Sequence, residues 1–344
     1  MKNNEFTIRA DGRIQTSIVD PKTGKRKYFY GKTKRELRQK ILEYNSNEKT
    51  GPLFNQVSEA WWDEAEEQLA YQSRRSYKVS KEQADVEFQD IYIKEIQPQN
   101  ITAYYRKLSQ RGMAQKTVEK RRLVLNLIFK YAMEQGYIQY NPCSVSKIPK
   151  GLKKSKREAA SEKDEAIIKS RKDLWLFPFV SIYTGMRKGE ILALQWKDVD
   201  FENECITVTK SVYFKGNAPE IKEPKTEAGV RVIPLLRPLK EQLLQIRSEE
   251  LDRYLFSDDG KTPLTEKRYA TLFKEYQKAT GITCTAHNIR HSFATIAFEH
   301  DVPVKTVQEI LGHKQISTTM DLYTHFRKSH IKKVTADLNN IFDQ

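Results

Sequence analysis

A strongly basic stretch divides this chain and limits the folds that are open to it. Residues 147–157, KIPKGLKKSKR, carry six basic residues and no acidic one. Pro149 and Gly151 interrupt regular structure there, so we interpret the stretch as an exposed linker. The 344 residues are enough for two or three cores of ordinary size. The expected divisions are residues 1–50, 51–146, the linker 147–157 and residues 158–344.

The first division is predicted to be a small sheet followed by a short helix. Three runs of alternating residues are separated by the turn sequences DG and DPKTGK. The runs are residues 6–8, 14–18 and 27–30. This pattern predicts a three-stranded meander. Thr33 and Glu36 then have the spacing of a capping box that opens a helix through Ile41.

Basic residues are concentrated around these strands. The whole chain has 60 Lys and Arg against 45 Asp and Glu, a net charge of +15, and residues 1–50 alone contribute +7. Such a surface attracts a polyanion, and nucleic acid is favoured over an anionic membrane. A lobe that only aids solubility is the alternative interpretation. The candidate DNA-binding residues here are Arg9, Arg13, Lys25, Arg26 and Lys27.

The second division is predicted to be helical. Pro98 can start one helix, which stops near Gly112, and a second helix stops at Gly136. The second helix has an apolar stripe of Val118, Leu125, Ile128, Phe129 and Ala132. Lys116, Lys120, Arg121 and Lys130 are interpreted as lying mostly off this stripe. They form either a solvated face or a surface that binds DNA phosphates.

Membrane, secreted and metal-binding classes are not favoured. No apolar run approaches the roughly 20 residues that a membrane-spanning helix needs, and the polar N-terminus has no signal-peptide core. Cys143, Cys205 and Cys284 are isolated, fit no zinc pattern and suit a reducing cytosol. We interpret them as small buried residues. No metal and no cofactor are expected.

The histidines gather near the end of the chain. All six follow residue 286, which indicates that the titratable chemistry is C-terminal. If residues 286–298, AHNIRHSFATIAF, are helical, then His287, Arg290 and His291 share one face. Apolar residues on the opposite face would anchor the helix. A chance grouping of surface side chains is the alternative.

A second arginine follows a break in the chain. In YTGMRKGEIL, residues 183–192, Gly185 interrupts the chain just before a predicted helix. Arg187 and Glu190 are three residues apart and can pair, which would hold the planar guanidinium in one orientation. An ordinary helix ion pair is the alternative interpretation.

Two further candidates lie in less regular segments. One β-hairpin region is expected from CITVTKSVYF and VRVIPL, and Lys225 lies in the turn before the second of these. It is either a solvated turn residue or a cation that reaches a phosphate. In LGHKQISTTMDLYTHF, Gly312 would end a helix and leave His313 after it. Tyr323 is either a half-buried packing residue or a functional one.

The order Arg, Lys, His-x-x-Arg, His, Tyr resembles the tyrosine recombinase (phage integrase) family. The matching segments are TGMRKGEIL, PKTEAGVRVIP, HNIRH, LGH and MDLYTHF, spread over roughly residues 160–330. The first division resembles the arm-site-binding domain of integrases from phages and integrative elements, and the second resembles their core-binding domain. The implied fold is multidomain α+β: a small N-terminal three-stranded β domain, a helical core-binding domain, and a mainly α catalytic domain with a small β-sheet.

The resemblance also implies a role for each matched residue. Arg187 and Arg290 are implied to clamp the scissile phosphate, and His313 to hydrogen-bond it. Tyr323 is the implied nucleophile. Lys225 is implied to donate a proton to the leaving 5′ oxygen, and His287 to act as acid or base. Glu190 matches an acidic supporting position, and His291 matches the motif as a structural residue. A phosphotyrosyl bond keeps the energy of the broken bond, so the chemistry needs neither ATP nor metal.

The implied activity is site-specific DNA recombination in the cytoplasm of a bacterial host. The implied partner is double-stranded DNA with core-type and arm-type attachment sites, bound by a homotetramer. Accessory DNA-bending or excision-directing proteins are compatible with this interpretation. The apolar stripe in residues 331–344 is expected to pack on a neighbouring protomer, and docking on the chain's own core is the alternative. A type IB topoisomerase and a non-catalytic DNA-binding regulator of the same fold are the alternatives.

Overall fold

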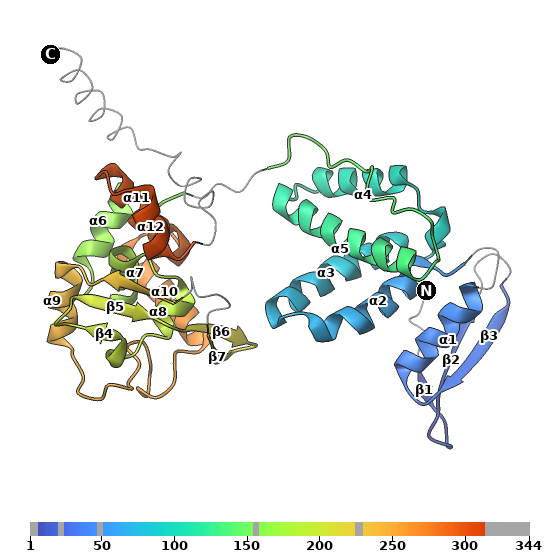
Figure 1. The fold of residues 1–344 in the computed structure, drawn as a ribbon, viewed down its shortest axis with the longest axis horizontal. Helices are drawn as coiled ribbons and strands as arrows, with labels where there is room; N and C mark the ends of the chain where they lie inside the picture. The colour runs from blue at the N-terminus through green and yellow to red at the C-terminus, as the bar shows by residue number, and fades with distance from the viewer. Residues whose placement is uncertain (1–5, 20–23, 47–50, 154–157, 224–229, 314–344) are drawn as a thin grey trace, which may run out of the picture. The chain divides into compact units, whose positions relative to one another are not determined.

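The break between two structural units lies inside the basic stretch 147–157. The computed structural model divides into Met1–Ser155 and Lys156–Gln344, and Figure 1 shows the elements of each unit. The structure describes residues 6–19, 24–46, 51–153, 158–223 and 230–313. Each unit has a hydrophobic core of its own.

The N-terminal sheet has the predicted topology. An antiparallel sheet in chain order is formed by β1 (Thr7–Ile8), β2 (Ile14–Val19) and β3 (Arg26–Gly31). Helix α1 (Lys34–Ser46) covers one face of it, where Phe29, Leu37 and Ile41 are buried together. The three-stranded meander followed by a helix is therefore confirmed.

The start of α1 is capped differently from the prediction. The backbone N–H of Glu36 donates to Thr33 Oγ1 over 3.1 Å, as in a capping box. The carboxylate of Glu36 accepts from the backbone N–H of Lys32 over 2.7 Å, one residue earlier than a capping box requires. The capping box is therefore only half formed.

Helix α1 also joins the sheet to the helical part of the same unit. Leu42 packs into the core of the helices, and Arg38 forms ion pairs with Glu59 and Asp63 of α2 (Phe54–Gln68). Apolar packing and paired charges therefore fix α1 against α2.

The helical part contains the two helices that the sequence predicts. The elements after α2 are α3 (Tyr71–Phe88), the short helix η1 (Ile93–Glu95), α4 (Pro98–Gln110) and α5 (Gln115–Glu134). Pro98 opens α4, and the five predicted stripe residues of α5 are all fully buried. Gly112 and Gly136 adopt the left-handed conformation just after α4 and α5 end.

The second unit is mainly helical. Its helices are α6 (Glu162–Ser170), α7 (Leu176–Thr184), α8 (Lys188–Leu192), η2 (Trp196–Asp198), α9 (Arg237–Gln245), α10 (Glu266–Thr280), α11 (Ala286–Glu299) and α12 (Val304–Leu311). Its strands are β4 (Val199–Asp200), β5 (Cys205–Val208), β6 (Ser211–Lys215), β7 (Ala218–Lys222) and β8 (Arg231–Pro234). The multidomain α+β class is confirmed.

The hairpin region predicted from CITVTKSVYF and VRVIPL is confirmed only in part: CITV and RVIP pair as β5 and β8, but the rest of the first segment does not join them. The segment CITVTKSVYF forms two strands that belong to different sheets, because β5 pairs with β4 and β8 while β6 pairs with β7. Ile206 on β5 and its register partner Ile233 on β8 are both buried in the core. Burial of these side chains explains why β5 pairs with β8.

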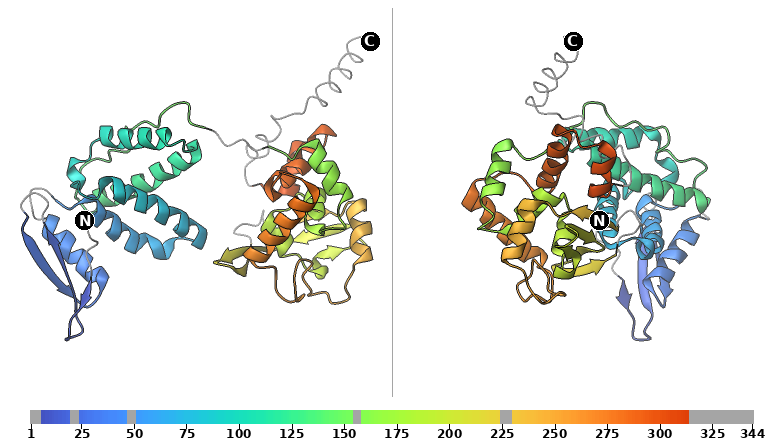
Figure 2. Two further views of the ribbon diagram at one scale, coloured as in Figure 1. Left: turned by 180° about the vertical axis from the view of Figure 1, so that it is seen from behind. Right: turned by 60° about the vertical axis from the view of Figure 1, so that its left-hand side comes forward.

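The helix α7 is the centre of this core. Seven of its nine residues are buried, and α11 packs along it. The helix α12 packs on α11 (Figure 2). It also approaches β8. The ends of α7, α11, α12 and β8 thus gather the side chains that are described next.

The described residues also bear on the membrane and cysteine predictions. Within the described ranges, no helix is long and apolar enough to cross a membrane. Cys143 and Cys284 are buried free thiols, as predicted, while Cys205 is only half-buried.

Candidate active site

A left-handed turn at Gly185 places Arg187 at the start of α8. Gly185 ends α7 with φ +62°, and a Cβ added there would lie 2.7 Å from the ring of Phe293, so only glycine fits. Arg187 is the N-cap residue of α8, and its Nη1 donates to Glu190 Oε1 over 2.7 Å. The backbone N–H of Arg187 donates to Glu190 Oε2 over 2.8 Å. The predicted Arg187–Glu190 pair is therefore present.

Arg290 projects from α11 into the same place. Its side chain is buried, its Nη1 donates to the carbonyl of Gly185 over 2.7 Å, and it lies 3.9 Å from Glu190 Oε2. A buried guanidinium needs such partners to offset the loss of water. The expectation that apolar residues anchor this helix holds, because Ile289 is fully buried in the core and Ile296 packs against it.

A third arginine, which the sequence analysis missed, completes the cluster. Arg231 on β8 is buried and donates from Nη2 and Nη1 to the two carboxylate oxygens of Glu190, over 2.8 and 3.2 Å. Strand alternation gave a usable signal, because Arg231 lies on the same face of β8 as the core residue Ile233. A charge on an inward face requires a partner.

The buried charges of Glu190 and Arg290 shift each other's pKa and are shifted by their neighbours. Burial raises the pKa of Glu190, but Arg231, Arg187 and Arg290 together outweigh it and lower the pKa from 4.5 to about 2. Burial and the charge of Arg187 lower the pKa of Arg290 to about 9. At neutral pH three guanidiniums therefore surround one carboxylate, and the cluster carries two excess positive charges.

The C-terminal end of α12 is held by the same three arginines. The carbonyls of three successive residues, Ile310, Leu311 and Gly312, accept from Arg231 Nε, Arg290 Nη2 and Arg187 Nη2 over 2.6, 2.7 and 2.8 Å. The last carbonyls of a helix lack intrahelical partners and carry partial negative charge, so cations stabilise them. Gly312 then turns the chain with φ +64°.

His313 also lies at this cluster. Its Nε2 is 3.0 Å from Arg290 Nη2, and its carbonyl accepts from Gln308 over 2.9 Å. A guanidinium only donates, so Nε2 accepts in this arrangement. Three arginines, one histidine and one carboxylate thus converge from α8, β8, α11 and the end of α12.

The other two candidate histidines, His287 and His291, occupy successive turns of α11. His287 is exposed in the first turn, while His291 is buried, and their rings meet edge to face at 4.1 Å between centroids. The predicted shared face of α11 therefore exists. Lys225 and Tyr323 lie outside the described residues, as does the predicted apolar tail 331–344.

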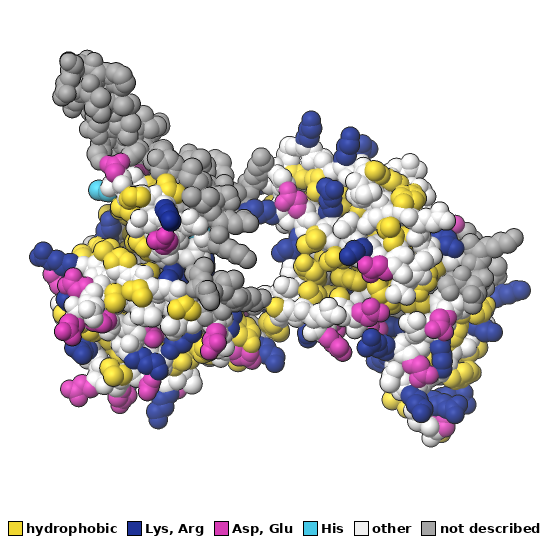
Figure 3. Space-filling view, viewed as in Figure 1, with side chains coloured by type: hydrophobic (Ala, Val, Ile, Leu, Met, Phe, Trp, Pro, Cys, Tyr) yellow, Lys and Arg dark blue, Asp and Glu magenta, His cyan; other side chains and the backbone are white. Residues whose placement is uncertain are grey.

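The candidate DNA-binding residues of the first unit are exposed, with one exception. Arg9, Arg13, Lys25, Arg26, Lys27, Lys116 and Lys120 are all exposed. Figure 3 shows Lys and Arg side chains over the visible face of this unit. The Arg9 guanidinium also lies 5.1 Å from the centre of the Tyr30 ring.

Arg121 is the exception, and its predicted place on the outer face is wrong. Its side chain is buried beside Tyr104. Burial raises the pKa of Tyr104, and the charge of Arg121 offsets only part of that rise. Position 121 is three residues after Val118 and four before Leu125, so it falls on the buried stripe of α5. The helical period excludes Arg121 from the exposed basic face.

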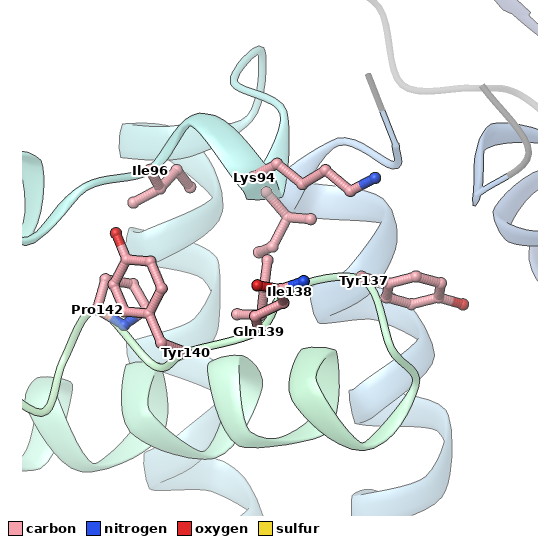
Figure 4. Close-up of a pocket in the computed structure, with 8 residues that line it drawn as sticks. Lys94, Ile96, Tyr137, Ile138, Gln139, Tyr140 and Pro142 are labelled. Carbon is pink, nitrogen blue, oxygen red and sulfur yellow. The ribbon is translucent and has the colours of Figure 1, made fainter. Parts of the chain in front are cut away.

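A hollow of about 260 Å³ lies in the helical part of the first unit. It opens between η1 and the segment 137–142, with Lys94, Ile96 and Tyr140 among its lining residues (Figure 4). None of its eight lining residues is a histidine, cysteine or carboxylate. This lining offers no catalytic set, so the arginine cluster is the candidate active site.

Comparisons with known proteins agree with this geometry. The profile of the phage integrase family matches residues 156–330, and that of the phage integrase central domain matches residues 54–147. A XerC-like tyrosine recombinase of Caldanaerobacter subterraneus is 31% identical over 96% of each chain. The ICEBs1 integrase of Bacillus subtilis is 28% identical, with 79% of this chain and 78% of that protein covered.

Two solved structures share the fold. An integrase of the Tn1549 transposon in complex with a circular intermediate DNA has a TM-score of 0.67 at 20% identity, and covers 83% of this chain and 99% of its own. A lambda integrase tetramer bound to a Holliday junction has a TM-score of 0.62 at 19% identity, covering 92% of this chain and 97% of its own.

Proposed function

The chain belongs to the phage integrase family of tyrosine recombinases, which are site-specific recombinases, and we propose that it works through a 3′-phosphotyrosyl intermediate formed on Tyr323. In this reaction it cleaves and rejoins DNA strands so that a mobile element is integrated or excised. Arg187, Glu190, His287, Arg290 and His313 are the members of the proposed site that lie within the described residues.

The observation that carries the proposal is the pair of guanidiniums held by one buried carboxylate. A phosphodiester carries one negative charge and gains another as a phenol oxygen attacks it. Arg187 and Arg290 supply preorganised donors and positive charge for that transition state, where electrostatic stabilisation is strongest. Glu190 fixes the orientation of Arg187 by a hydrogen bond. It lies 3.9 Å from Arg290, whose guanidinium is oriented by the carbonyl of Gly185.

The proposed chemistry is a reversible transfer of the DNA 3′-phosphoryl group from the 5′ oxygen to the oxygen of Tyr323. The phenol oxygen of Tyr323 bonds to phosphorus, and the bond from phosphorus to the 5′ oxygen breaks. His287, which serves as acid or base, takes the proton of the phenol, and Lys225 gives its proton to the leaving 5′ oxygen. His313 hydrogen-bonds the phosphate. The 5′ hydroxyl of a second strand then attacks the phosphotyrosine, which restores Tyr323 and joins the new strand.

The N-terminal sheet suits a second kind of DNA site. Its face away from α1 presents Tyr28 and Tyr30 with Arg9 and Arg26, all exposed. Aromatic and basic side chains on an open sheet bind phosphates and read base edges in a groove. We assign residues 1–50 to arm-type DNA.

The helical part and the assembly complete the proposal. Lys116 and Lys120 are exposed on α5 and suit phosphate contacts with core-type DNA, so we assign residues 51–146 to that site and residues 158–344 to catalysis. The lambda integrase structure is a tetramer on a Holliday junction. We propose the same assembly on DNA here, with accessory proteins that bend DNA or direct excision.

A covalent trapping experiment tests the activity. A suicide substrate is DNA of the attachment site that is nicked near the cleavage point. After cleavage, the short fragment that carries the free 5′ hydroxyl is lost, so the strand cannot be religated. Wild-type protein should form a covalent protein–DNA band, and Tyr323→Phe should form none. Recombination between two sites, rather than mere relaxation of supercoils, separates a recombinase from a topoisomerase. A wild-type protein that binds its site but traps no band would support a non-catalytic regulator.

A further inference from the structure

Arg231 is a buried arginine to which the proposed chemistry gives no role. It lies on β8, and its guanidinium reaches both Glu190 and the end of α12. We infer that Arg231 is a positioning residue for strand cleavage, which holds Glu190 and α12 so that the two clamp arginines and His313 face one phosphate. This inference rests on the proposed function.

The contact with Glu190 is bidentate. Arg231 Nη1 and Nη2 donate to Oε1 and Oε2, the same oxygens that accept from the Arg187 side chain and backbone. Two parallel hydrogen bonds fix the plane of a carboxylate as well as its place. The orientation of Arg187 is therefore set through Glu190 by a residue on a different element.

Arg231 also determines how much positive charge the clamp offers. Glu190 would by itself cancel half of the charge of Arg187 and Arg290. The charge of Arg231 offsets that of Glu190, which leaves both clamp arginines available for a phosphate that gains charge in the transition state. Loss of Arg231 would remove this balance without removing either clamp residue.

The contact with α12 connects β8 to His313. Arg231 Nε donates to the carbonyl of Ile310 over 2.6 Å, and a Cβ added to Gly312 would lie 3.1 Å from Arg231 Nη1. The guanidinium thus packs under the turn that directs His313 toward Arg290. Nε, Nη1 and Nη2 all donate within the protein, so Arg231 acts through these partners.

The test is single-turnover cleavage of the suicide substrate by the full-length protein, with binding and thermal stability measured in parallel. Arg231→Gln should cleave about 100-fold more slowly than wild type, with core-site binding within about threefold. Arg231→Lys keeps the charge and should recover part of the rate. The neighbouring Val232→Gln changes an exposed residue of the same strand and should cleave like wild type.

A double-mutant cycle tests whether Arg231 acts through Glu190. If it does, adding Arg231→Gln to Glu190→Gln should cost much less than it costs in the wild type, because the unbalanced carboxylate is already gone. Independent effects that multiply would overturn the inference, as would an Arg231→Gln protein that cleaves at the wild-type rate. If Arg231→Gln does not fold, Arg231→Lys decides, and a wild-type rate for it overturns the inference. Failure of the wild type itself to trap DNA would instead overturn the proposed function.

Discussion

Arg290 Nη2 lies 3.0 Å from His313 Nε2, although 23 residues separate the two side chains in the sequence. The two meet because α11 and α12 pack together and Gly312 turns the chain back at the end of α12. An imidazole and a guanidinium held at this distance can both hydrogen-bond one phosphate oxygen, which requires His313 to rotate its donor toward the ligand.

His313→Ala is therefore expected to slow cleavage strongly and to leave DNA binding nearly intact. Loss of one preorganised donor at a developing negative charge costs about 100-fold to 1,000-fold in rate. Single-turnover trapping on the suicide substrate measures the rate. His300, exposed at the C-cap of α11, is the matched control, and His300→Ala should cleave like wild type. Equal cleavage rates for both variants would mean that His313 has no part in cleavage.

Glu190 makes stability depend on pH in a definite direction. Its folded-state pKa of about 2 lies below the ordinary value of 4.5, so its contribution is complete above pH 4.5 and is lost as pH falls toward 2. By pH 3 the wild type should lose about 2 kcal/mol of unfolding free energy that Glu190→Gln does not lose. Denaturant unfolding of both proteins between pH 6 and pH 3 measures the difference. Parallel pH curves would contradict the assigned role of the arginines.

Gly185→Ala should destabilise the second unit more than Gly281→Ala does. Gly185 and Gly281 both end helices in the left-handed conformation, but only at Gly185 would a Cβ meet a neighbour, the Phe293 ring. Gly281→Ala should cost about 1 kcal/mol from backbone strain alone, and Gly185→Ala about 3 kcal/mol. Thermal or urea unfolding of the two variants tests this. Equal costs would mean that the ring moves aside freely.

Local sequence patterns predicted the parts of the site that depend on one element. The helical period put His287, Arg290 and His291 on one face of α11, and three-residue spacing predicted the Arg187–Glu190 pair. Glycine preferences predicted the turns at Gly185 and Gly312. Each of these depends on backbone geometry within a few residues, which the sequence encodes directly.

The parts that were missed depend on contacts between distant elements. Arg231 meets Glu190 across 41 residues, and the division of CITVTKSVYF between two sheets involves β4 and β7, which lie outside the predicted hairpin region. Strand pairing is chosen by which faces are buried together, and a single strand does not specify its partner. Arg121 differs, because its burial followed from the helical period of α5 and was readable from the sequence.

The N-terminal sheet provides the last prediction, which concerns salt. Alternation along β3 puts Arg26 on the face with Tyr28 and Tyr30, while Phe29 faces α1. If that face binds arm-type DNA, Arg26→Gln should remove one phosphate contact and reduce the slope of log affinity against log salt by about 0.9. Arg35 is exposed on α1, away from that face, so Arg35→Gln should leave the slope unchanged. Filter binding of arm-site DNA from 50 to 200 mM salt measures both slopes. An unchanged slope for Arg26→Gln, or an equal drop for Arg35→Gln, would mean that DNA does not bind this face of the sheet.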